Sequence, residues 1–451
     1  MPQPATSPSL SLTEVNQAQT KYQMIGGVCV AIAVLALIIS VSGMGSRFPL
    51  ELMLTVLGMF LLGGILFALP YYKGPAGIRN NGVMFKSMTN RGTIAWILAI
   101  VLTGFYIIIY WYAFLLEGLI RIFDPLSLVL SGKPADQWFM YGAFYSMAVV
   151  IMGIRFIGKY RHSRYHVIRT FSVMFFQVGF AFLIPMFLKK LNEPEFYFSY
   201  FWPLKYNYLF PADVASLMNS GNLGTFMVFW GAVMTFIATP LLTYKYGKRW
   251  YCSWVCGCGG LAETAGDPYR HLSSKKLSAW KIERWMVHSV LVFITITTSL
   301  LWLNSYYAGG ILGTASGAFA QWYGFLIGAV FSGVIGVGFY PVMGSRVWCR
   351  FGCPMAALLG LFQRFKSKFR ITTNGGQCIS CGNCSTHCEM GIDVRWYAQR
   401  EQNIVRSSCV GCGVCASVCP RGVLKLENGS EEGRINDKPI TIANNSITVH
   451  L

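Results

Sequence analysis

One spacing of cysteines occurs twice near the end of the chain: Cys378-Ile-Ser-Cys381-Gly-Asn-Cys384-Ser-Thr-His-Cys388, and then Cys409-Val-Gly-Cys412-Gly-Val-Cys415-Ala-Ser-Val-Cys419-Pro420. A 4Fe–4S cubane needs four converging thiolates, and in such paired runs the fourth cysteine ligates the other cluster. We therefore expect two clusters, one held by Cys378, Cys381, Cys384 and Cys419 and the other by Cys409, Cys412, Cys415 and Cys388.

This spacing is that of bacterial ferredoxins with two clusters. A zinc site is the first alternative, but zinc usually takes its four ligands as two pairs. Disulfides are the second alternative, and they are rare in a reducing cytoplasm. The two runs differ after their last cysteine, because Glu389 follows Cys388 where Pro420 follows Cys419. That difference concerns the loop and the potential of the cluster more than its ligation.

Composition places the rest of the chain in a membrane. Of 451 residues, 54% are hydrophobic and only 12% are charged, about half of the roughly 25% usual in soluble proteins. A disordered chain is excluded by this hydrophobicity, and a secreted disulfide scaffold is excluded by length and cysteine density. The formal net charge of +19 would suggest nucleic acid in a soluble protein, but membrane loops account for much of it.

Eight charge-poor stretches are long enough to cross a bilayer, which takes about 20 residues. Loops that alternate along the chain differ strongly in Lys and Arg, and this bias predicts cytoplasmic N- and C-termini in a multi-pass protein of the bacterial inner (plasma) membrane. We expect no nucleic-acid partner. The predicted spans lie near 24–45, 52–72, 92–116, 137–154, 170–188, 214–244, 285–304 and 322–344.

The predicted fold class is an all-α polytopic membrane protein with a C-terminal α+β domain of the two-cluster ferredoxin type. Its domains are predicted as a disordered tail (1–20), a membrane domain of five spans (21–222), a second of three spans (223–345), a basic juxtamembrane connector (346–370), the two-cluster domain (371–428) and a hairpin tail (429–451).

Two further cysteine pairs, Cys252-x3-Cys256 and Cys349-x3-Cys353, each follow a predicted span. On a helix, residues four apart share a face, so each pair is expected to present two sulfurs together at the membrane surface. These thiols, with Cys258 nearby, are candidates for a third metal or cluster or for dithiol/disulfide chemistry. They are alternatively inert cysteines that support helix ends.

The segments Arg249-Trp-Tyr-Cys-Ser-Trp-Val-Cys256 and Arg346-Val-Trp-Cys-Arg-Phe-Gly-Cys-Pro354, followed by the two runs, resemble the membrane polyferredoxins, which include NapH, NosR and CcoG proteins. The resemblance covers roughly residues 225–425 and leaves the first five spans without a counterpart. Gly257 departs from it, because a proline is expected there. The resemblance implies electron traffic between a membrane quinone or a metal partner and the clusters, and its CcoG branch implies copper at the pair thiols.

His166 and His288 open two of the predicted spans near the same face, where they are candidates to contact a quinone or a haem. Ordinary surface histidines are the alternative. No predicted span carries a mid-depth Asp or Glu, which argues against an ion pump. The aromatic-rich loop 193–211 reads as an interfacial belt, with a quinone or partner groove as the alternative.

The resulting hypothesis is a membrane-bound iron–sulfur protein that relays single electrons between the membrane, with the quinone pool as the expected source or sink, and a redox protein partner or larger complex. An oxidoreductase subunit of the quinol dehydrogenase type, without a complete active site of its own, fits this reading. The alternative is a copper- or metal-reducing assembly factor for a respiratory metalloenzyme. A non-catalytic anchor is the third possibility.

Overall fold

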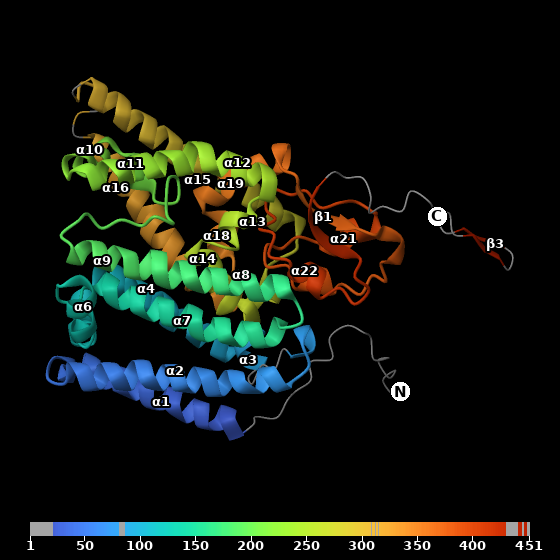
Figure 1. Cartoon of the computed structure of the whole chain (residues 1–451), viewed down its shortest axis with the longest axis horizontal. Helices are drawn as coiled ribbons and strands as arrows, with labels where there is room; N and C mark the ends of the chain where they lie inside the picture. Colours follow the sequence, from blue (N-terminus) through green and yellow to red (C-terminus); the bar gives the residue numbers. More distant parts are fainter. Residues whose placement is uncertain are drawn as a thin grey trace.

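The computed structural model describes residues 21–80, 86–307, 309–311, 313, 315–429, 441–443 and 446–448, so the tail expected at 1–20 lies outside it. Eight helices in these residues are long and apolar enough to cross a membrane, and they lie side by side with the cysteine-rich region at one end (Figure 1). The predicted multi-pass fold class is confirmed. The spans are Lys21–Val41 (α1), Pro49–Lys73 (α2), Thr93–Trp111 (α4), Gln137–Tyr160 (α7), Arg164–Lys190 (α8 to α9), Asn222–Tyr246 (α11 to α12), Leu277–Tyr306 (α15) and Ala315–Ile335 (α16 and η8).

Two spans widen into π-helix near their middle, and a third does so over its last 12 residues. The widened segments are Phe176–Leu183 (η4), Met234–Ala238 (η6) and Gly324–Ile335 (η8), and the flanking α-helical parts are Arg164–Phe175 (α8), Ile184–Lys190 (α9), Asn222–Val233 (α11), Thr239–Tyr246 (α12) and Ala315–Tyr323 (α16). Such turns are rare and occur frequently at functional sites.

Short helices connect the spans. On the end far from the cysteine-rich region they are Met44–Ser46 (η1), Ala113–Leu116 (η3), Glu117–Arg121 (α5), Asp124–Ser131 (α6), Tyr206–Leu209 (η5) and Pro211–Asn219 (α10). On the near end they are Gly77–Asn80 (η2), Lys86–Thr89 (α3), Arg249–Cys252 (α13), Gly257–Thr264 (α14), Asp267–Leu272 (η7), Tyr340–Met343 (α17), Val347–Phe351 (α18) and Pro354–Lys366 (α19).

The cysteine-rich region, residues 369–428, is called the module below. Its two-stranded antiparallel sheet pairs Phe369–Thr373 (β1) with Leu424–Asn428 (β2), from Phe369 opposite Asn428 to Thr373 opposite Leu424. Between these strands lie Gly375–Gln377 (η9), Asn383–Thr386 (α20), Val394–Gln399 (α21) and Val414–Ser417 (α22). The strands Thr441–Ala443 (β3) and Ser446–Thr448 (β4) form a separate antiparallel pair.

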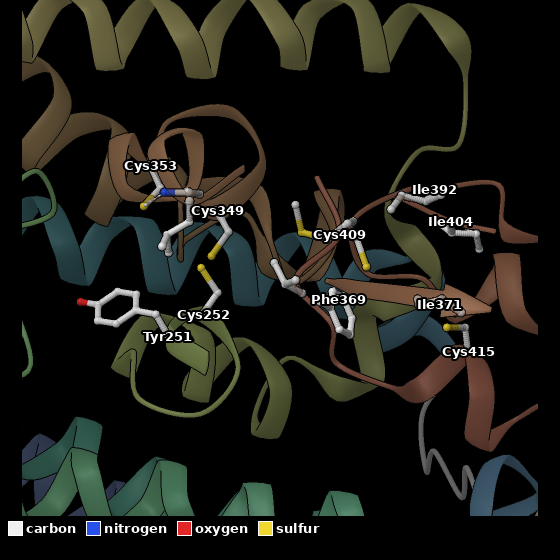
Figure 2. Packing of buried hydrophobic residues seen from close by; sticks show 14 of the residues in the cluster. Tyr251, Cys252, Cys349, Cys353, Phe369, Ile371, Ile392, Ile404, Cys409 and Cys415 are labelled. Atoms are coloured by element: carbon white, nitrogen blue, oxygen red, sulfur yellow. Dashed lines mark hydrogen bonds between the residues drawn. The ribbon is translucent and has the colours of Figure 1, made fainter. Parts of the chain in front are cut away.

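The module and the membrane helices share one buried core. This core joins the pair thiols to module residues such as Phe369, Cys409 and Cys415 (Figure 2). Near it, Phe156 and Tyr160 at the end of α7 pack on Val414 and Val418. The module is therefore seated on the helices and not merely tethered to them.

The expected interfacial belt is wrong, and the basic connector is partly buried. Phe196, Phe201 and Tyr208 in the loop 193–211 are only 1–2% exposed, so these rings pack inward instead of forming an interfacial belt. In the basic connector, Arg346 and Arg350 are 1% and 4% exposed and form ion pairs, whereas Arg364, Lys366 and Lys368 are exposed. Arg346 and Arg350 are buried because each pairs with buried carboxylates that are far away in the sequence.

Candidate metal centres and their buried surroundings

The first four cysteines of the predicted ligand sets meet at one cavity. Its lining includes Cys378, Cys381, Cys384 and Cys419 with the apolar side chains of Ala398, Val423 and Leu424. Gly382 has a φ of +79° and begins the short helix that carries Cys384, so glycine allows the left-handed turn that brings Cys381 and Cys384 to one point. We call this the Cys378 cavity.

The other four cysteines meet at a second cavity. Its lining includes Cys388, Cys409, Cys412 and Cys415 with Ile371, Ile392 and Ile404. Gly413 repeats the role of Gly382, with a φ of +83° at the start of α22. In each cavity the fourth cysteine comes from the other run. We call this the Cys409 cavity.

The separation of the sulfurs favours a cluster over a single ion. Tetrahedral zinc with Zn–S bonds of about 2.3 Å requires sulfurs roughly 4 Å apart. Within the described residues, the group of metal-ligand atoms lying within 4.8 Å of one another is Glu263, Glu389 and Cys412, and it combines two carboxylates with one thiol. Neither thiol set is compact enough for zinc, whereas an apolar cavity lined by four thiols suits a 4Fe–4S cluster.

The loop of the Cys409 cavity is fixed by the membrane helices. Its four consecutive carbonyls, from Cys409 to Cys412, all accept hydrogen bonds from side chains outside the module. Gln363 Nε2 donates to Cys409 (2.8 Å), Ser253 Oγ to Val410 (2.8 Å), Tyr165 Oη to Gly411 (2.8 Å) and Arg169 Nη1 to Cys412. Buried carbonyls need such partners, so this loop is built into the membrane domain.

The two cysteine pairs also converge. Cys252, Cys256, Cys349 and Cys353 are each 5–7% exposed and belong to the shared core, and the sulfurs of Cys252 and Cys349 face each other (Figure 2). We call these four residues the thiol group. The structure brings all four together, which the sequence left open.

The expected geometry of each pair is wrong, because neither pair lies on one helix. Cys252 ends α13 and Cys256 precedes α14, while Cys349 lies in α18 and Cys353 precedes α19. Both breaks have the same form, since the amides of Cys256 and Cys353 donate to Tyr251 and Trp348 over 2.9 Å. Two related helix–turn–helix units thus face each other across the thiol group.

Burial and hydrogen bonds separate the acidities of these thiols. Burial raises the pKa of Cys252 to about 12. The pKa of Cys256 falls to about 7, because Cys258 donates a hydrogen bond to it and the amides of Gly259 and Cys258 add to that effect. Arg346 faces these buried thiols as a cation, but several buried thiolates need more positive charge than one arginine supplies, so binding a metal would release protons and stabilise this arrangement.

A buried ion network lies between the thiol group and the Cys409 cavity. Arg270 pairs with Glu389 (2.8 Å) and with Asp267 (3.0 Å), and Arg346 pairs with Glu389 (3.0 Å) and with Glu263 (2.8 Å). At its edges Lys159 lies 2.7 Å and Arg155 3.5 Å from Asp267, and Arg169 pairs with Glu263. Because arginines already pair with Glu263 and Glu389, the two carboxylates that lie within 4.8 Å of Cys412 belong to this ion network.

The network is cationic overall and touches both thiol sites. Five cationic side chains face three carboxylates. Arg346 Nη1 also donates to the carbonyl of Cys252 (3.1 Å) and lies 3.7 Å from Cys349 Sγ. Burial alone would raise the pKa of Glu389, but Arg270 and Arg346 outweigh burial and lower it. The excess positive charge complements a cluster whose four thiolates make it anionic.

The structure does not bring the two candidate histidines together. His166 lies on α8, stacks on Tyr160 with ring centres 5.1 Å apart and shares a hydrogen bond of 2.7 Å with Ser163. His288 is half-buried on α15. Helix α8 packs against α7 and α14, whereas α15 packs against α18 and α19. Quinone or haem contact at these residues remains a prediction without support from their placement.

Sequence reasoning missed the ion network. Arg346 belongs to the predicted basic connector, and its partners Glu263 and Glu389 are distant in sequence. Arg270 pairs with Asp267 three residues away, but the pair that joins it to the module, with Glu389, is also distant in sequence. One signal was available. Glu263 and Asp267 are acidic residues in an otherwise apolar segment directly after the first cysteine pair, and Glu389 occupies the position of a proline in the other run.

Comparison with known proteins agrees with this geometry. Residues 370–420 match the family described as "4Fe-4S dicluster domain". Residues 228–279 and 323–372 both match the family described as "4Fe-4S binding domain", and each of these two segments holds one pair of the thiol group.

Two curated proteins are similar to part of the chain. The Escherichia coli protein named "Putative electron transport protein YccM" is 26% identical over 36% of this chain and 46% of its own length. An uncharacterized protein of Methanocaldococcus jannaschii is 26% identical over 36% of this chain and 59% of its own length. The chain thus spans about half the length of these relatives. No solved structure matches it.

Proposed function

We propose that this chain, a polyferredoxin-like membrane protein with 4Fe–4S-binding domains, relays single electrons between the quinone pool and a redox protein partner. The observation that carries the proposal is that one buried core holds the thiol group together with cysteines of both module cavities, and that Arg346 and Glu389 connect the thiol group to the Cys409 cavity. A 4Fe–4S cluster supplies reversible one-electron chemistry when bound. The residues of the chain hold, space and charge-balance the three sites.

The eight module cysteines form the first two sites of this proposal. Cys378, Cys381, Cys384 and Cys419 would hold one cluster, and Cys409, Cys412, Cys415 and Cys388 the other. Cys409 and Cys415 are buried, and membrane-domain side chains bind the loop of that cavity. The Cys378 cavity borders Ile379, which is 43% exposed. The Cys409 cavity is therefore the inner station and the Cys378 cavity the outer one.

The thiol group would be a third resident site. Its four sulfurs are buried, both of its pairs fall in segments that match a 4Fe–4S binding domain, and Arg346 supplies positive charge beside Cys349. A copper-handling factor needs thiols that a cargo ion can reach and leave. Because all four thiols lie within the shared core, a resident cluster is the better supported reading.

The partner would dock beside the Cys378 cavity. There Ile379 and Trp396 are 43% and 42% exposed, and Arg400 stacks on the Trp396 ring at 4.1 Å. Arg395 and Arg421 line the same cavity. An exposed apolar contact with a basic rim suits an acidic redox protein. With the charge bias of the loops, we place this face in the cytoplasm and the helices in the bacterial inner membrane.

Anaerobic purification with iron and sulfide analysis tests the number of sites. We expect about twelve irons per chain for three clusters of four irons, and about eight for the double variant Cys252→Ala/Cys349→Ala. Cys29→Ala is the matched control, because Cys29 is a buried lone cysteine on α1. Zinc in place of iron would overturn the proposal, and eight irons in the parent chain would remove the third site.

Reduction by a quinol tests the relay. We expect duroquinol to bleach the visible absorbance of the anaerobic protein and to produce an EPR signal from reduced clusters. If clusters are present but no quinol or quinone changes their oxidation state at any accessible potential, the quinone-linked function is wrong and the anchor hypothesis gains.

A further inference from the structure

Two adjoining cavities lie inside the helix bundle. One, of about 350 Å³, is lined by residues that include Tyr206, Ile327 and Trp348, and the other, of about 400 Å³, by residues that include Tyr141, Tyr145 and Gln177. Both are lined by Tyr197, Tyr200 and Cys258. We call them together the tyrosine cavity. Its size and its mixture of aromatic rings with few polar groups are those of a ligand site.

Chain neighbours of the thiol group line this cavity. Trp348 and Pro354, which precede and follow Cys349 and Cys353 in the chain, form part of its lining, as does Cys258, two residues beyond Cys256. Gln177 lies at the middle of the Arg164–Lys190 span, and Gly257 lies against its side chain. A ligand in the cavity would thus sit deep in the membrane and next to the third site.

A buried acceptor faces the cavity without a partner. Gln177 is 4% exposed, and its Nε2 donates to Ser146 Oγ over 3.2 Å, but its Oε1 accepts no hydrogen bond in the described structure. An unpaired buried acceptor is costly. A ligand hydroxyl that donates to this oxygen would remove the cost.

The contacts at the cavity wall explain why position 257 is a glycine and not the proline expected there. A Cβ on Gly257 would overlap both Gln177 Oε1 and the Tyr200 hydroxyl, and its amide donates to that hydroxyl. A proline has no amide proton and would fill this space. The glycine therefore keeps two polar groups, an amide oxygen and a phenol, together at the cavity wall.

The cavity wall includes two of the three π-helical segments. Gln177 lies in η4, and Ile327, Gly328 and Ser332 lie in η8. Widened turns of this kind reposition side chains at functional sites. The coincidence of η8 with the cavity wall is a second observation that does not depend on the unpaired acceptor, because Gln177 lies in η4.

The cavity reaches the end of the bundle that is far from the module. Asp136, Lys189 and Glu195 line it there, with Lys189 Nζ 2.7 Å from Glu195 Oε2 and the Tyr197 hydroxyl bonded to Glu195. Asp136 and Glu195 are 48% and 32% exposed at their side chains. Helix α7 runs from this rim to the module, roughly 35 Å away at 1.5 Å per residue. No described module residue lines the cavity.

We propose that the tyrosine cavity is the ring site for a hydroquinone and that its protons exchange with the side of the membrane opposite the module. This inference rests on the proposed function and adds a site and a direction to it. In the oxidative direction the hydroquinone loses two electrons and two protons and becomes a quinone. The electrons leave one at a time through the thiol group toward the partner, and the protons leave through the rim of Glu195 and Asp136.

The consequence is charge separation without a membrane-buried carboxylate. Electrons move toward the module while protons appear on the far side, so each hydroquinone moves two charges across part of the membrane. The reverse reaction takes two protons from the far side. In both directions the opening of the cavity determines on which side of the membrane protons are exchanged, and the position of the module determines on which side electrons are exchanged.

Photolabelling of the whole 451-residue chain tests the site. We expect an azidobenzoquinone to label the segments 138–145 or 197–207, and we expect duroquinol to prevent this labelling. Gln177→Leu should weaken the labelling. It should also raise the KM for duroquinol about tenfold, as the loss of one buried hydrogen bond would. Gln321→Leu, at an exposed glutamine on α16, is the matched control with no expected change. Tyr200→Phe serves if Gln177→Leu lowers the iron content. Labelling elsewhere, or labelling that neither variant weakens, overturns the assignment.

Proteoliposomes test the direction. A pH dye is trapped inside, duroquinol is the donor, and membrane-impermeant ferricyanide outside accepts electrons without taking protons. Where the module faces outward, we expect two protons in the lumen per duroquinol oxidised. Protons released outside, while the clusters are still reduced by duroquinol, overturn this inference and leave the proposed function standing. Clusters that duroquinol cannot reduce overturn the proposed function itself.

Discussion

Replacing Glu389 by glutamine should raise the reduction potential of the inner cluster. The carboxylate of Glu389 lies within 4.8 Å of Cys412 Sγ, and Arg270 and Arg346 keep its pKa low enough for it to be ionised. A negative charge roughly 7 Å from the centre of a cluster opposes an added electron by about 2.4 kcal/mol at an effective dielectric constant of about 20. Because 1.4 kcal/mol corresponds to about 59 mV for one electron, Glu389→Gln should raise the potential by about 100 mV.

An anaerobic redox titration followed by EPR measures this change. Only one of the module signals should move, because the Cys378 cavity has no carboxylate in its described lining. Glu401→Gln is the control, since Glu401 is an exposed carboxylate of the same module. A potential that stays within about 20 mV of the parent value, or one that falls, would show that the charge does not act on the cluster at the stated distance and dielectric constant.

Three further predictions concern stability. Burial alone would raise the pKa of Asp267, but its cationic neighbours hold that pKa well below the usual range. The stability that Asp267 contributes is therefore present above a pH of about 4 and is lost as the pH falls further. Asp267→Asn should lower the free energy of unfolding by about 3–5 kcal/mol near neutral pH and remove this acid dependence, which thermal melts across pH in detergent measure. Gly257→Ala should lower the yield of folded, iron-loaded protein in size-exclusion profiles, because a Cβ overlaps Gln177 and Tyr200. Tyr165→Phe removes the hydrogen bond to the Gly411 carbonyl, which is worth about 1 kcal/mol, and should make chelators extract iron several-fold faster; equal rates for parent and variant would count against a fixed loop.

The fold was largely predictable because its signals are local. Apolar runs give the eight spans, and the repeated cysteine spacing gives the module, so both follow from neighbours in the chain. The exchange of Cys388 and Cys419 between the two ligand sets was also anticipated, and the cavities group these cysteines in that way. Which atoms hold iron stays a prediction until metal is measured.

The surroundings of the sites were not predictable because they depend on pairs that are far apart in sequence. Arg346 meets Glu389 and Glu263, and four side chains from three different parts of the membrane domain meet the Cys409 loop. The helical reading of the cysteine pairs failed because the chain turns after Cys252 and before Cys353. A spacing of four fits a helix, but it also fits a break between two helices.

The clamped carbonyls of the Cys409 loop have a mechanical consequence. If this domain carried electrons by rotating between two docking positions, it would have to break four hydrogen bonds and separate a buried core in every turnover. The module instead stays fixed on the membrane helices during electron transfer. Carriers must come to it by diffusion, so turnover should respond to the concentration of the soluble carrier and to ionic strength, whereas electron transfer inside the protein should be insensitive to solvent viscosity.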